Sequence, residues 1–211
     1  VLDSGKELKT IYVSQADPDY YFGVETIKEI FPTAEVVTTP AVLEKINAKL
    51  AGKIAFWGPK MGANAPRTPV LPKAISGTTL TVDGQTVEIR GATGPLAHRP
   101  YAWIPSIKAV VGNIGVFGTN MHVWTADTQT VAERSAWVAQ LDEMAALQPA
   151  LVVPGHMPAG TALDVSNVTY TKGYLQAFEK NAAATKTSAE LIDAMKKAYP
   201  AAPMGLSLDI G

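Results

Sequence analysis

The stretch IYVSQADPDYYFG, residues 11–23, places two carboxylates and a phenol within four positions: Asp17, Asp19 and Tyr20. Carboxylates that lie close together shift each other's pKa, and such pairs act as general acids and bases in enzymes. Carboxylate oxygens also bind divalent metal ions. Each aspartate has a structural alternative, because Asp19 fits the N-cap of the helix that follows and Asp17 precedes a proline, as is typical of a turn.

The chain has only three histidines, His98, His122 and His156, and it has no cysteine, which excludes disulfides and thiolate zinc sites. His156 follows the apolar run VVPG, so we expect it at a strand end in a catalytic or ligand role. The pair His98-Arg99 suits an anionic substrate, but an exposed loop pair is the favoured interpretation. His122 lies near Trp124, which predicts either the rim of a binding site or ordinary packing.

Composition limits the classes of function. The chain has 211 residues, of which 47% are apolar and 18% charged, with a net charge of -1. This balance is typical of a globular domain and gives no reason to expect nucleic acid or an anionic membrane as partner. No apolar run reaches the length of a membrane span. We expect a cytoplasmic protein or an exported one that needs no disulfides.

Hydrophobic periodicity predicts alternating strands and helices in a single domain, residues 1–211. Four prolines and three glycines between residues 56 and 77 indicate a long loop, and its part Trp57–Pro72 is a candidate lid over a site. We expect strands at 10–14, 35–39, 102–105, 107–113 and 150–156, a hairpin at 78–91, and helices at 24–31, 40–51, 128–148, 166–184 and 187–199.

The polar clusters follow the predicted strands, where loops of mixed α/β proteins commonly converge on one site. We therefore expect four segments to meet: 15–20, 91–98, 112–113 and 154–156.

Several of these motifs resemble the metallo-β-lactamase fold hydrolases. The resemblance rests on the 11–23 loop, FPTAEVVTTPAV, the VDGQTVEIRG hairpin, VVPGHMPAG and the AYP segment, in that order along nearly the whole chain. It implies an αββα sandwich whose active members bind two metal ions that activate a water molecule. The family pattern has strands before this stretch, so the resemblance also implies a chain that lacks the first N-terminal strands.

Carried over residue by residue, the resemblance implies an altered metal site. It aligns the family's ligand positions with Gln15, Asp17, Asp19, Tyr20, Ala92, Asn113 and His156, of which only Asp19 and His156 hold the family's residue type. Ala92 has no donor atom, and the neutral amide oxygens of Gln15 and Asn113 are weak ligands for zinc. We therefore expect no standard dinuclear zinc centre and no required cofactor.

Three hypotheses remain open for this pocket, each with a small molecule as substrate or ligand. The first is catalysis without two metals, by the catalytic candidates Asp17, Asp19, Tyr20, Asn113 and His156, in which Tyr20 and Asn113 donate to an oxyanion. Its substrate-binding candidates are Gln15, His98, His122, Trp57 and Trp124. The second is binding without catalysis. The third is one divalent metal ion held by Asp17, Asp19 and His156. The oligomeric state is not determined by the sequence.

Overall fold

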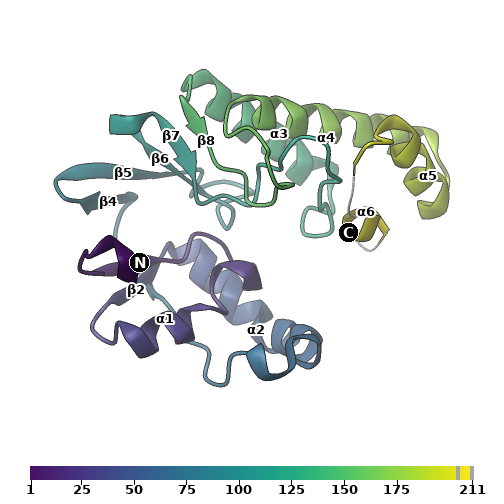
Figure 1. The fold of residues 1–211 in the computed structure, drawn as a ribbon. Helices are drawn as coiled ribbons and strands as arrows, with labels where there is room; N and C mark the ends of the chain where they lie inside the picture. Colours follow the sequence, from purple (N-terminus) through teal and green to yellow (C-terminus); the bar gives the residue numbers. More distant parts are fainter. Residues whose placement is uncertain (203–204, 210–211) are drawn as a thin grey trace.

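Two sheets with helices on their outer sides form the fold (Figure 1), and the computed structural model describes residues 1–202 and 205–209. One sheet has three parallel strands in the order β1-β2-β3, and the other has five in the order β4-β5-β6-β7-β8. Helices α1 and α2 accompany the first sheet, whereas α3 and α4 lie along the second. The predicted αββα sandwich is therefore confirmed.

The first layer joins strands β1 (Thr10–Tyr12), β2 (Glu35–Thr38) and β3 (Lys73–Ala74) to helices α1 (Val24–Ile30) and α2 (Pro40–Met61). Helix α2 begins where Thr39 accepts a hydrogen bond from the Val42 amide over 3.4 Å, and a proline occupies its first position. Its residues Val42 and Ile46 are fully buried in the core of this layer. Burial of this face fixes how α2 lies on the sheet.

The second layer contains strands β4 (Thr79–Val82), β5 (Gln85–Arg90), β6 (Tyr101–Ile104), β7 (Ala109–Val111) and β8 (Leu151–Val152). The first four are antiparallel, and β8 joins β7 in parallel. The turn between β4 and β5 has φ of 48° at Asp83 and 77° at Gly84, which explains why Asp-Gly stands there. The predicted hairpin is thus observed.

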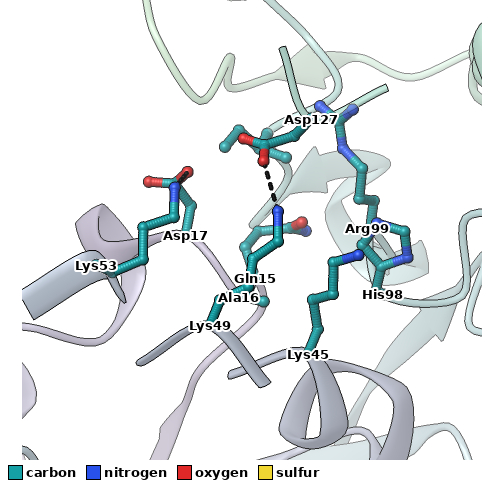
Figure 2. Close-up of a pocket in the computed structure, with 10 residues that line it drawn as sticks. Gln15, Ala16, Asp17, Lys45, Lys49, Lys53, His98, Arg99 and Asp127 are labelled. Atoms are coloured by element: carbon teal, nitrogen blue, oxygen red, sulfur yellow. Dashed lines mark hydrogen bonds and ion pairs between the residues drawn. The ribbon is translucent and has the colours of Figure 1, made fainter. Parts of the chain in front are cut away.

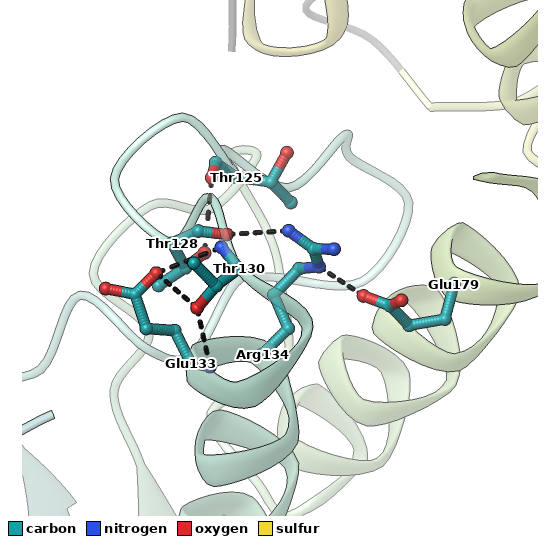
Figure 3. Close-up of polar contacts among 6 residues, drawn as sticks. All are labelled: Thr125, Thr128, Thr130, Glu133, Arg134 and Glu179. Atoms are coloured by element: carbon teal, nitrogen blue, oxygen red, sulfur yellow. Dashed lines mark hydrogen bonds and ion pairs between the residues drawn. The ribbon is translucent and has the colours of Figure 1, made fainter. Parts of the chain in front are cut away.

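Helices α3 (Val131–Ala146) and α4 (Ser166–Ala184) pack on the second sheet, and Trp137 and Tyr174 are fully buried there. Helix α3 begins with a capping box between Thr130 and Glu133, shown in Figure 3. Arg134 donates to the carbonyl of Thr128 over 2.9 Å and pairs with Glu179 of α4, so it ties the two helices to the preceding loop. Helices α5 (Ser188–Ala198) and α6 (Gly205–Asp209) end the described chain. None of the described helices is long and apolar enough to span a membrane.

The prediction of a long loop after Ala51 is wrong: α2 continues past the expected end at Ala51, into the predicted loop, and ends at Met61. Gly58 and Pro59 indicate a break locally, yet Ile54, Trp57 and Met61 pack against the core of the first layer. These three lie at helical spacing, and the area they bury offsets the weak local propensity. Trp57 therefore lies on a helix rather than in a lid loop. Helix α3 and strand β8 are also shorter than predicted, at 131–146 and 151–152.

Candidate functional site

The segment after β1 reaches from the first layer to the second through Gln15. Its side-chain amide donates to the backbone carbonyls of Pro100 and Gly112, and the residue is only 1% exposed. The loops that follow β1, β5 and β7 therefore meet at this residue. In this position the amide nitrogen holds two backbone segments together.

Asp17 follows as the cap of a short 3-10 helix, η2 (Pro18–Tyr20). Its carboxylate accepts from the Asp19 amide over 3.4 Å and lies 3.7 Å from Nζ of Lys53 on α2. Burial raises the pKa of Asp17 above its ordinary value, and the charge of Lys53 opposes that rise. The turn role considered for Asp17 is thus observed, whereas Asp19 is not a cap.

Asp19 and His156 form a pair although they lie far apart in the sequence. Oδ2 of Asp19 lies 3.4 Å from Nε2 of His156, and the two side chains are 60% and 36% exposed. The ring of His156 lies 5.7 Å from that of Phe117, and a backbone bridge joins these two residues. The His156 ring is therefore held in place by its contact with Phe117, while both side chains of the pair remain partly exposed.

Tyr20 and Asn113 lie beside this pair, but their polar groups are engaged. The Tyr20 hydroxyl donates to the Asn113 carbonyl over 3.0 Å. The Asn113 side-chain amide accepts from the Val116 amide at 2.7 Å and donates to the Val153 carbonyl at 3.3 Å. Burial, and then the charges of Asp17 and Asp19, raise the pKa of Tyr20 well above its ordinary value. Both side chains thus stabilise the loops that present Asp19 and His156.

A small cavity of about 30 Å³ opens between the two layers, and of the catalytic candidates only Asp17 lines it (Figure 2). Such a volume holds roughly one water molecule or one small polar group. The lining residues are Gln15, Ala16, Asp17, Lys45, Lys49, Lys53, His98, Arg99, Ile114 and Asp127. Three lysines and one arginine outnumber the two carboxylates around this space, so it is cationic.

His98 and Arg99 are not an exposed loop pair, which corrects the favoured interpretation of the sequence. Arg99 is only 6% exposed, and its guanidinium carbon lies 4.3 Å from the centre of the Trp137 ring. Burial lowers the pKa of Arg99 to about 10, so it keeps its charge at neutral pH. Burial, together with the charges of Lys45 and Arg99, lowers the pKa of His98 to about 4, so its ring is uncharged at neutral pH.

Three other candidates lie away from the cavity lining. His122 is 2% exposed and contacts the Tyr174 hydroxyl over 3.0 Å, within the core of the second layer. Trp57 packs against the core of the first layer. Trp124 donates to Asp127 over 3.1 Å, so it reaches the cavity only through that carboxylate.

Sequence reasoning missed the lysines of α2 and Asp127. Lys45, Lys49 and Lys53 recur every four residues, so they form a row along one face of the helix. That spacing was readable from the sequence. The side of α2 that faces the second layer was not, because it depends on the packing of the whole helix.

The residues at the expected ligand positions do not fit a two-metal centre. The Asn113 amide oxygen already accepts from the Val116 amide, and Ala92 has no donor atom. The Gln15 nitrogen donates to the backbone, and its oxygen, which has no partner among the described residues, is a neutral and weak zinc ligand. Among residues 1–202 and 205–209, no group of three or more histidine, aspartate or glutamate side chains is placed to hold a metal ion. Only the pair of Asp19 and His156 combines a carboxylate with an imidazole at these positions.

No family model matches the chain, and no curated protein matches its sequence. Solved structures do match. A metallo-beta-lactamase from Pontibacter korlensis is 21% identical with a TM-score of 0.58, over 82% of this chain and 72% of that one. A metallo-beta-lactamase family protein from Thermus thermophilus is 16% identical with a TM-score of 0.59, over 95% and 72%. A beta-lactamase domain protein from Burkholderia ambifaria is 12% identical with a TM-score of 0.64, over 92% and 62%. The chain therefore has the metallo-β-lactamase fold.

Proposed function

We propose that this chain is a small-molecule hydrolase that works without a two-metal centre and uses Asp19 and His156 as its acid–base pair. The observation that carries this proposal is the 3.4 Å contact between Oδ2 of Asp19 and Nε2 of His156 at converging strand ends. A carboxylate at one ring nitrogen fixes the tautomer and orientation of a histidine, and it stabilises the imidazolium that forms during proton transfer.

In the proposed mechanism each ring nitrogen of His156 has its own role. Asp19 lies at Nε2, so in the proposed mechanism it accepts a hydrogen bond from an Nε2–H and Nδ1 is the proton acceptor. Among the residues that the structure describes, no hydrogen-bond partner occupies Nδ1. A water molecule attacks the carbonyl carbon of an ester or lactone as Nδ1 takes its proton. When the carbon–oxygen bond to the leaving group breaks, the leaving oxygen takes that proton from His156.

The alternative with one metal ion receives less support from the geometry. It needs Asp17, Asp19 and His156 to turn toward a common point, but the Asp17 carboxylate caps η2 and lies 3.7 Å from Lys53. An ammonium beside a carboxylate competes directly with a bound cation. Binding without catalysis is the other alternative, and it is an outcome of the experiment below.

The test is a screen of esters, lactones and β-lactams, followed by two variants of the pair. Asp19→Asn and His156→Ala should each lower kcat for the substrate found by about 100-fold or more, the usual contribution of a general base. EDTA should leave kcat unchanged. Asp193→Asn, at an exposed position of α5, is the matched control and should keep parental activity.

Loss of activity in EDTA with recovery on added metal would contradict the proposal. So would turnover that persists in both variants. A ligand that binds at the site without being turned over by the parent would favour the binding alternative.

A further inference from the structure

We propose that the cavity between α2 and the β5–β6 loop binds a small oxyanion group, a carboxylate or a phosphate, carried by the substrate. This inference rests on the proposed function and names the class of substrate for the same site. It starts from Arg99, which is 6% exposed and has a buried Nη1 with no hydrogen-bond partner among the described residues.

A buried cation without a counter-charge is expensive, because it gives up its water and gains no carboxylate in return. In residues 1–202 and 205–209, no carboxylate oxygen lies within 4.0 Å of the Arg99 guanidinium or the Lys45 ammonium. The Trp137 ring beneath Arg99 offsets part of this cost. An anion in the adjoining cavity offsets more of it, and a guanidinium offers two donors to a carboxylate or phosphate.

The lysine row on α2, Lys45, Lys49 and Lys53, adds to the positive charge that Arg99 places beside the cavity. Lys49 pairs with Asp127 over 2.9 Å and Lys53 lies 3.7 Å from Asp17, whereas Lys45 has no carboxylate partner among the described residues. Figure 2 shows Lys45 and Lys49 pointing from α2 into the cavity, with Lys45 next to the His98 ring. Like charges four residues apart on a helix repel each other, and a shared anion reverses that effect.

His98 supplies a neutral donor at the same place. Its Nε2 is buried and has no hydrogen-bond partner among the described residues. A neutral imidazole carries one N–H, which suits an anion oxygen without adding charge. Because the cavity measures about 30 Å³, it accepts one anionic group while the rest of the substrate extends outward. Asp17 lines the cavity, whereas Asp19 and His156 do not. In this proposal the rest of the substrate therefore extends outward past Asp17 to reach the Asp19–His156 pair.

The experiment titrates the full chain with sodium phosphate and, separately, sodium acetate at constant ionic strength, followed by calorimetry and by the NMR signals of His98. We expect one of these anions to bind, and added sodium chloride to weaken its binding through screening. A lower Kd for phosphate than for acetate would indicate a phosphorylated substrate. A lower Kd for acetate would indicate a substrate with a carboxylate. Lys45→Gln should raise the Kd of that anion about tenfold, the effect of losing one charge-assisted hydrogen bond.

Lys45 is partly exposed, so its variant should fold, and Lys197→Gln on exposed α5 is the matched control that should keep the parental Kd. His156→Ala should also keep the parental Kd, which separates this inference from the proposed function. Absence of binding by both anions overturns the inference, as does an equal Kd for Lys45→Gln, Lys197→Gln and the parent. In either case the lysine row serves only to hold α2 against Asp17 and Asp127.

Discussion

The hydroxyl of Tyr20 donates to the backbone carbonyl of Asn113 over 3.0 Å, which joins the loop after β1 to the loop after β7. Asp19 belongs to the first of these loops, and the second lies against the strand end that carries His156. The hydrogen bond thus fixes the loops on which the proposed acid–base pair depends. It also commits the Tyr20 proton, so this phenol is a positioning group.

Tyr20→Phe should lower the free energy of unfolding by about 1 kcal/mol, because it removes this hydrogen bond and leaves a part-buried carbonyl without its donor. Urea unfolding of parent and variant measures the difference. Tyr21→Phe is a suitable control, since the Tyr21 hydroxyl is buried and has no partner among the described residues. Equal stability of Tyr20→Phe and the parent would show that the hydrogen bond contributes nothing.

Gly155→Ala tests how closely the same loops approach. A Cβ at Gly155 would lie 2.4 Å from the Asn113 carbonyl oxygen and 2.5 Å from the Tyr20 hydroxyl, so the backbone next to His156 must move. We expect a loss of about 1–3 kcal/mol in stability, the usual effect of overpacking. Gly173→Ala is the matched control. A Cβ there meets no atom within 4 Å, and alanine in helix α4 should stabilise by about 0.5–1 kcal/mol. Similar thermal midpoints for the two variants would contradict the crowding at Gly155.

The ends of the predicted strands indicate which polar segments of the chain converge on the site. Gln15 follows a predicted strand, Asn113 and His156 end two others, and the structure brings these segments together. Strands β7 and β8 are parallel neighbours, so the ends that lead to Asn113 and His156 meet at one edge of the second sheet whatever the side chains are. Gln15 follows β1 of the first sheet and reaches them only because the two layers pack together. The functional roles of these residues stay predictions.

Other features depend on tertiary packing that sequence patterns do not contain. Gly58 and Pro59 correctly mark weak helix propensity, but the burial of Trp57 and Met61 decides the outcome. His122 and His156 look alike in sequence, since apolar residues adjoin both: Met121 and Val123 flank His122, and His156 follows VVPG. Only the folded chain shows that His122 faces Tyr174 in the core while His156 faces Asp19.

The neutral state of His98 predicts how stability depends on pH. Its pKa is lowered to about 4 in the folded chain, against 6.5 for an ordinary histidine. Below pH 6.5 His98 is therefore protonated in the unfolded chain but not in the folded one. The free energy of unfolding that this residue contributes above pH 6.5 is lost progressively as the pH falls to about 4. The loss from this residue should reach about 2–3 kcal/mol.

Unfolding free energies of the parent and His98→Gln between about pH 4 and 7 isolate this contribution, because the other groups titrate in both proteins. The parent should lose stability more steeply than the variant over that range. Parallel pH profiles would mean that His98 is protonated as easily in the folded chain as in the unfolded one.

Zinc should have little effect on the stability of this chain. A metal that binds only the folded state stabilises it by about 2.7 kcal/mol when its free concentration is roughly 100 times Kd. Here the ligand positions include an alanine and two neutral amides, and the Asn113 amide oxygen already accepts from the Val116 amide, so strong zinc ligands are lacking at these positions. We expect protein purified without added metal to carry well under two equivalents of zinc. Its thermal midpoint should be the same after dialysis against EDTA and after addition of zinc. Elemental analysis measures the zinc content, and paired thermal melts measure the midpoint.

Two retained equivalents of zinc, with a midpoint that falls in EDTA and recovers with zinc, would show that other donors in the chain assemble a metal centre. The proposed metal-independent mechanism would then fail.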